Sequence, residues 1–148
     1  MLSSFYERMK NATSRLIRDE DLLEATGAAI ALMCVSEGVV EEGAVDEGIR
    51  RAKACKAILD LKYTPTEIEK TILRMVDRIE HGGRSGRNEC MSELRDIPMK
   101  DSTGEMGKIV LLIALDVGDV GGLNDSKQKM ARTIASELNV NFDEVSGL

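Results

Sequence analysis

The sequence predicts an all-α protein that folds as a single compact domain of about seven helices. Apolar residues recur at three- and four-residue spacing through most of the 148 residues, which is typical of amphipathic helices. The alternating pattern of a β-strand is not found over any length. The chain has only two prolines, and several of its 13 glycines mark breaks in the helical periodicity, as at residues 82–83 and 121–122.

Four helices are expected in the first eighty residues. Residues 2–16 carry an apolar stripe, and residues 22–35 are apolar almost all round, which is typical of a helix buried on several sides. A further stripe covers residues 45–59. Thr64-Pro65-Thr66-Glu67 forms a capping box with proline at the first helical position, and it predicts a helix that ends at His81-Gly82-Gly83.

A second capping box, Ser102-Thr103-Gly104-Glu105, predicts the start of another buried helix over residues 106–117. The glycines at 118, 121 and 122 are expected to end this helix. The other elements expected in this half are a polar loop over residues 84–88, a weaker helix over 90–98, an amphipathic helix over 124–138 that Asn124 caps, and a final short turn from Asn141.

Two related helix-loop-helix units are predicted within one domain spanning residues 1–148. In each unit a buried helix leads through an acid- and glycine-containing loop, 36–42 or 118–125, into an amphipathic helix. We therefore expect a pseudo-repeat in which the two units fold against each other around the two buried helices.

Composition excludes several classes of partner. The net charge of −6 repels phosphate backbones, and two Phe, two Tyr and no Trp leave no base-stacking platform, so nucleic acid is not expected. The apolar runs fall well short of the roughly 20 residues that span a membrane, so membrane insertion is not expected either. Three widely spaced cysteines without a CxxC motif indicate reduced thiols, and we expect a cytoplasmic location.

No catalytic motif is found, and the chain is not expected to be an enzyme. The single histidine, His81, stands beside two glycines at an expected helix end, where it suits the helix dipole. The segment from Gly104 to Lys108 lacks the spacing of a phosphate-binding loop and the hydroxyl that would hold magnesium.

The acidic loops hold the candidate metal ligands. If the two units pack face to face, carboxylates from both loops would converge and would bind a hard divalent cation of the calcium or magnesium type through oxygen. Helix-dipole and turn chemistry is the alternative explanation, because acids favour the first turns of helices. The candidate ligands are Glu37, Glu41, Glu42, Asp116, Asp119 and Asp125.

At these loops the sequence resembles the TerB tellurite-resistance family, within the wider TerB/DjlA-like group of helical domains. The segment Val35-Ser36-Glu37-Gly38 with Glu42 is similar to the family's first loop, and Gly121-Gly122-Leu123-Asn124-Asp125 to its second. The ending from Ile134 to Leu148 is similar to the family's C-terminus, whereas Lys127 stands where an acid is common. The resemblance implies an all-helical, non-enzymatic cytosolic protein of the tellurite-resistance and stress-response type.

Three functions therefore stand as hypotheses. The first is a TerB-like adaptor that binds protein partners, among them other Ter-type proteins, through an acidic surface. The second is a divalent-cation sensor that uses the two acidic loops, and the third is a carboxylate-dependent hydrolase. The apolar face from Phe5 to Leu16 leaves both a monomer and a homodimer open.

Overall fold

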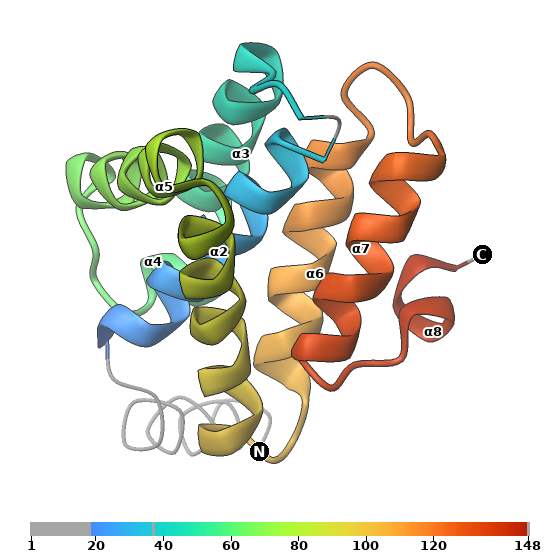
Figure 1. Ribbon diagram of the computed structural model, residues 1–148. Helices are drawn as coiled ribbons and strands as arrows, with labels where there is room; N and C mark the ends of the chain where they lie inside the picture. The colour runs from blue at the N-terminus through green and yellow to red at the C-terminus, as the bar shows by residue number, and fades with distance from the viewer. Residues whose placement is uncertain (1–18, 37, 148) are drawn as a thin grey trace, which may run out of the picture.

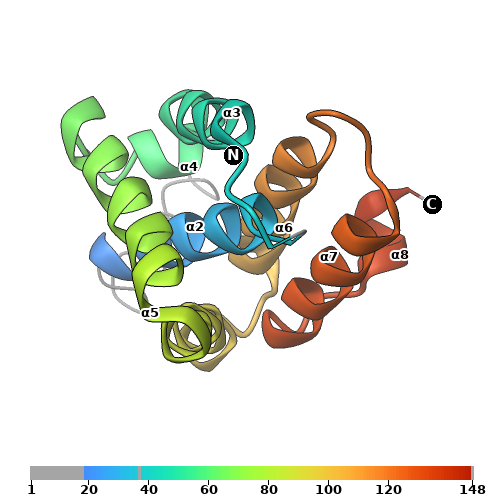
Figure 2. The same ribbon diagram turned by 45° about the horizontal axis from the view of Figure 1, so that its top comes forward.

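Helix α2 (Asp19–Cys34) lies at the centre of the fold, between α5 (Pro65–Lys100) and α6 (Glu105–Gly118) (Figures 1 and 2). The computed structural model describes residues 19–36 and 38–147, which contain helices and no strand, so the all-α prediction is confirmed. Every residue from 22 to 35 except Glu24 is buried, as the apolar pattern predicts. The helix expected over residues 2–16 lies outside the described residues.

The stripe over residues 45–59 forms two helices, not one. Helix α3 (Glu42–Ala54) ends where Cys55 adopts an extended backbone, with φ −73° and ψ 117°, and α4 (Lys56–Leu59) begins directly after it. Val45 and Ile49 are buried as the periodicity predicts, whereas the Leu59 side chain is 44% exposed. Because the helix breaks at Cys55, the last residue of the predicted apolar stripe, Leu59, does not lie on the buried face.

Helix α5 contains a sharp kink at Gly83, whose φ of 56° and ψ of −127° are not helical. The predicted cap is confirmed, because the Thr64 hydroxyl accepts a hydrogen bond from the Glu67 backbone N–H at 3.1 Å, and the Glu67 carboxylate accepts from that hydroxyl, also at 3.1 Å. The polar loop expected over residues 84–88 is wrong, because the chain changes direction at Gly83 alone and continues as helix. Gly86 permits this close return, since a Cβ there would lie 1.9 Å from the Arg78 carbonyl oxygen.

The start of α6 also differs from its prediction. No capping box forms at residues 102–105, since the residue before the helix is Gly104 in a left-handed conformation with φ 79°. The buried Asp101 carboxylate caps the helix: it accepts hydrogen bonds from the Thr103 N–H at 3.1 Å and from the Met106 N–H at 3.0 Å. The sequence pattern placed the cap on the hydroxyl residues of this turn, and the Thr103 hydroxyl does accept from the Glu105 N–H at 3.2 Å, so it shares the capping with the Asp101 carboxylate.

The C-terminal elements follow the predictions closely. Asn124 caps α7 (Asp125–Glu137) by accepting from the Lys127 N–H at 3.0 Å, and Asn141 caps α8 (Phe142–Ser146) by accepting from the Glu144 N–H at 3.1 Å. Helix α6 lies between α2 and α7, while α3 packs along α6 (Figures 1 and 2). The two helix-loop-helix units therefore meet through their buried helices, α2 and α6.

One hydrophobic core joins the described helices. It combines apolar side chains of α2 and α6 with the inward faces of α3, α5 and α7 and with Phe142 of α8. In the described part of the chain, every helix is too short or too polar to cross a membrane.

Candidate functional site

The two acidic loops lie side by side at one end of the molecule, at the top of Figure 1. The first loop joins α2 to α3, and the second joins α6 to α7. They approach closely: a Cβ at Gly43, in the first turn of α3, would lie 3.9 Å from Cγ1 of Val120, and one at Gly121 would lie 4.0 Å from Oε2 of Glu41. The structure thus brings together the loops that the sequence singles out.

A lysine ammonium lies between the two loops. Lys127, in the first turns of α7, has a side chain that is only 3% exposed. Its Nζ donates a hydrogen bond to the Val120 carbonyl oxygen at 2.6 Å, and it lies 3.4 Å from Oε1 and 3.5 Å from Oε2 of Glu41. One positive charge therefore connects the carboxylate of the first loop to the backbone of the second.

Local backbone structure sets this geometry. Gly121 and Gly122 adopt φ values of 76° and 98°, which other residues rarely reach, and they turn the chain back toward α7. Asn124 then caps α7 and fixes the first turns of the helix that carry Lys127. On the other loop, the Glu41 N–H donates to the Cys34 carbonyl oxygen at 3.2 Å, which holds the carboxylate beside α2.

The nearby thiol is not a nucleophile. Burial and, to a smaller extent, the Glu41 carboxylate raise the pKa of Cys34 to about 12, with Lys127 opposing both. Because the thiolate is the reactive form, Cys34 remains an inert core side chain at neutral pH. Its part in the site is to position Glu41 through its carbonyl oxygen.

The other predicted ligands do not gather around Lys127. Asp116 lies 3.7 Å from Arg51, and Asp119 follows the C-terminus of α6. Glu42 and Asp125 occupy first helical turns, where their charge complements the helix dipole. Glu37 lies outside the described residues. Within residues 19–36 and 38–147, no three carboxylate, thiol or imidazole groups are placed to hold one metal ion.

Four exposed carboxylates surround the paired loops, and we call them the acidic end: Glu42, Asp46, Asp119 and Asp125. None of the four forms an ion pair with another described residue. The Val39 side chain of the first loop is 73% exposed beside them. The acidic end thus combines uncompensated negative charge with an exposed apolar side chain.

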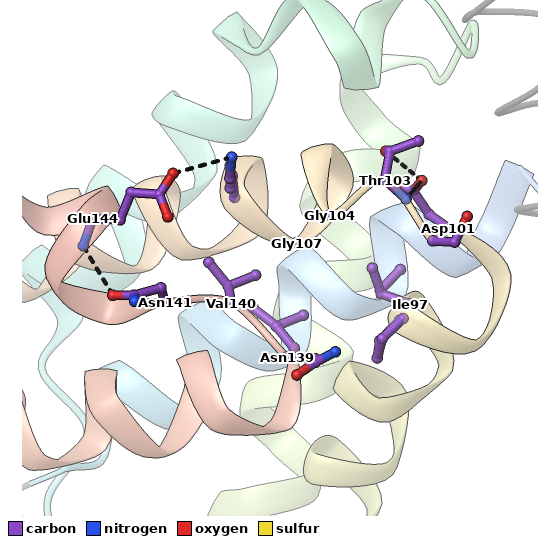
Figure 3. A pocket seen from close by; sticks show the side chains of 13 residues that line it. Ile97, Asp101, Thr103, Gly104, Gly107, Asn139, Val140, Asn141 and Glu144 are labelled. Carbon is purple, nitrogen blue, oxygen red and sulfur yellow. Dashed lines mark hydrogen bonds and ion pairs between the residues drawn. The ribbon is translucent and has the colours of Figure 1, made fainter.

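A pocket of about 240 Å³ lies at the opposite end of α6, between the α5–α6 turn and the α7–α8 turn (Figure 3). Ile97 and Val140 supply apolar walls, while Asp101 and Glu144 lie on its two sides. Both carboxylates already have partners, since Asp101 caps α6 and Glu144 lies 3.7 Å from Lys108. None of the predicted metal ligands lines this pocket.

A second pocket, of about 270 Å³, adjoins the first acidic loop. It is lined mainly by valines of the loop and by Ile79, with Glu80 and Arg87 as its charged members. It lies beside the kink of α5 and contains no thiol, imidazole or hydroxyl side chain. The apolar lining suits a hydrophobic contact.

A pair of carboxyl groups between α2 and α5 has no counterpart in the sequence analysis. Burial, and then the neighbouring Glu24 carboxyl to which it hydrogen-bonds, raise the pKa of Glu93 to about 7. Arg78 opposes the shift from 3.5 Å, and Arg74 lies 3.3 Å from Glu24. The local sequence pattern does not reveal this pair, because Glu24 and Glu93 lie on separate helices and come together only in the folded protein.

Comparison with known proteins identifies no relative. No protein-family model, no curated protein and no solved structure matches the chain. The resemblance to the TerB family therefore stays an expectation, and the geometry of the paired loops carries the functional proposal.

Proposed function

We propose that this protein is a non-enzymatic, TerB-like adaptor that binds a basic protein partner through its acidic end. The contact of Lys127 with both loops is the observation that carries the proposal. It holds the loops together while the carboxylates around them stay exposed and unpaired with described residues. A preformed, uncompensated acidic surface attracts a positively charged partner and speeds its association.

The apolar part of the surface supports a protein partner over a small cation. Val39 is 73% exposed and adjoins the pocket beside the first loop. Protein interfaces combine an apolar centre with a polar, charged rim, and this end of the molecule offers both. The expected partner segment therefore carries Lys or Arg together with at least one apolar side chain.

The resemblance to TerB proteins supports the biological setting of the proposal. It favours a cytoplasmic adaptor in a tellurite-resistance or stress-response system, with other Ter-type proteins as partners. The free thiols of Cys34, Cys55 and Cys90 are in keeping with a reducing compartment.

The divalent-cation sensor is the second candidate. The convergence of Glu41 with the Val120 carbonyl favours it, because carboxylate and carbonyl oxygens are ligands for calcium. Lys127 opposes it, because its ammonium occupies the space between these oxygens.

Charge neutralisation tests the adaptor proposal. The acidic-end variant carries Glu42→Gln, Asp46→Asn, Asp119→Asn and Asp125→Asn. A matched control removes four exposed charges elsewhere, through Glu69→Gln, Asp77→Asn, Glu89→Gln and Asp143→Asn. Cross-linking and affinity capture from expressing cells, quantified by mass spectrometry, compare both with the unchanged chain.

We expect one or more basic partners that the unchanged chain and the control capture equally and that the acidic-end variant loses at least about ten-fold. Capture should also weaken as the salt concentration rises, since exposed charges are screened. A partner retained by the acidic-end variant, or the absence of any specific partner, would refute the proposal.

A further inference from the structure

The space between the two loops is built as a site for one small cation. The Lys127 side chain is 3% exposed, and its ammonium donates a hydrogen bond to the Val120 carbonyl oxygen of the second loop at 2.6 Å. The same ammonium lies 3.4 Å from the Glu41 carboxylate of the first loop. The carbonyl belongs to Val120, just beyond the C-terminus of α6, where the helix dipole favours a cation. The charge, the burial and the position of the oxygen acceptors therefore all favour a small cation here.

We propose that the resident cation of this site is the Lys127 ammonium itself, so that the chain supplies internally the positive charge that joins its two acidic loops. The site accepts an ammonium-type cation and does not require a divalent metal. The inference does not rest on the proposed adaptor function, because it concerns how the loops are held and not what they bind.

Coordination chemistry favours an ammonium over a divalent ion here. Calcium takes six to eight oxygen ligands at roughly 2.3–2.6 Å, and magnesium demands near-octahedral geometry. The structure supplies the Val120 carbonyl oxygen as a hydrogen-bond acceptor at 2.6 Å and the Glu41 carboxylate as an ion-pair partner at 3.4 and 3.5 Å. The other acidic residues in and beside the loops that the structure describes are exposed or pair elsewhere, as Asp116 does with Arg51.

Burial of Lys127 makes its oxygen acceptors necessary, because the Lys127 side chain is 3% exposed whereas the Glu41 side chain is 31% exposed. A buried ammonium without acceptors lowers stability. Gly121 closes the site, since a Cβ there would lie 3.8 Å from Nζ of Lys127. Truncation of the Lys127 side chain should therefore leave a small cavity that has the shape of the fragment removed. The Val120 carbonyl oxygen and a Glu41 carboxylate oxygen would line this cavity.

Chemical rescue tests the proposal. Lys127→Ala removes a group equivalent to propylammonium, whereas Lys127→Met keeps most of the volume and loses the charge. Lys129→Ala is the matched control, because Lys129 is exposed on the same helix. Urea unfolding of all four proteins is followed in propylammonium chloride and in sodium chloride at equal ionic strength.

We expect both Lys127 variants to raise the unfolding equilibrium constant about ten- to hundred-fold, and Lys129→Ala to leave it nearly unchanged. Propylammonium should raise the urea midpoint of Lys127→Ala alone, because only that variant has an empty site. Calcium, magnesium and a chelator should leave the midpoint of the unchanged chain where it is.

Three results would overturn the proposal. The first is a Lys127→Met variant as stable as the unchanged chain, since the charge would then contribute nothing. The second is equal rescue of all variants by propylammonium, which would show a general solvent effect. The third is a urea midpoint of the unchanged chain that rises with millimolar calcium or magnesium, while the midpoint of a Glu41→Gln variant does not respond to these ions.

Discussion

Glu93 is a carboxyl group whose charge state depends on its neighbours in the fold. Burial and the Glu24 carboxyl raise its pKa from 4.5 to about 7, with Arg78 opposing and Asp96 adding to the increase. Because the folded-state pKa lies above the unfolded value, the protonated carboxyl contributes stability that is complete below pH 4.5. That contribution is lost as the pH rises through 7.

Glu93→Gln should therefore flatten the dependence of stability on pH. For the unchanged chain we expect the free energy of unfolding to fall by about 2 kcal/mol between pH 5 and pH 8, whereas the glutamine variant should lose much less. Glu89→Gln, an exposed change on the same helix that also contacts Arg78, is the control. Urea unfolding across the pH range measures both, and parallel curves for all three proteins would contradict the assignment.

At the scale of the element, the kink of α5 depends on glycines with different roles. A Cβ at Gly86 would meet the Arg78 carbonyl oxygen at 1.9 Å, whereas one at Gly82 would meet nothing within 4 Å. Gly86→Ala should therefore destabilise the protein by about 2–4 kcal/mol, since backbone must move to admit the methyl group. Gly82→Ala should be neutral or slightly stabilising. Thermal or urea unfolding separates the two, and equal effects would refute this view of the kink.

The helices could be predicted from the sequence where local chemistry decides them. Thr64, Asn124 and Asn141 cap helices as predicted, because the cap and its partner N–H lie three residues apart. The break at Gly83 falls where the helix was predicted to end, but its form could not be predicted, because a single residue with positive φ replaces the loop that the polar residues after it suggest. The cap of α6 could not be predicted fully, because the buried Asp101 accepts from the Met106 N–H and from the Thr103 hydroxyl, which itself accepts from the Glu105 N–H.

At the scale of the whole molecule, the sequence predicted which loops matter but not what joins them. The acids and glycines of both loops mark helix ends, and two buried helices that pack together bring these ends to one side. Lys127 is different, because in sequence it is only a polar residue in the first turns of a helix. Its burial and its contact with Glu41, 86 positions away, arise from the packing of the two units.

The central claim is that Lys127 and Glu41 act on stability as a pair across the two loops. A double-mutant cycle with Lys127→Met, Glu41→Gln and the combined variant tests it directly, by urea unfolding at constant pH and salt. We expect a coupling free energy of about 1–2 kcal/mol, so the combined variant should be more stable than the two single losses predict. Losses that add to within about 0.3 kcal/mol would show that the ammonium and the carboxylate do not join the loops.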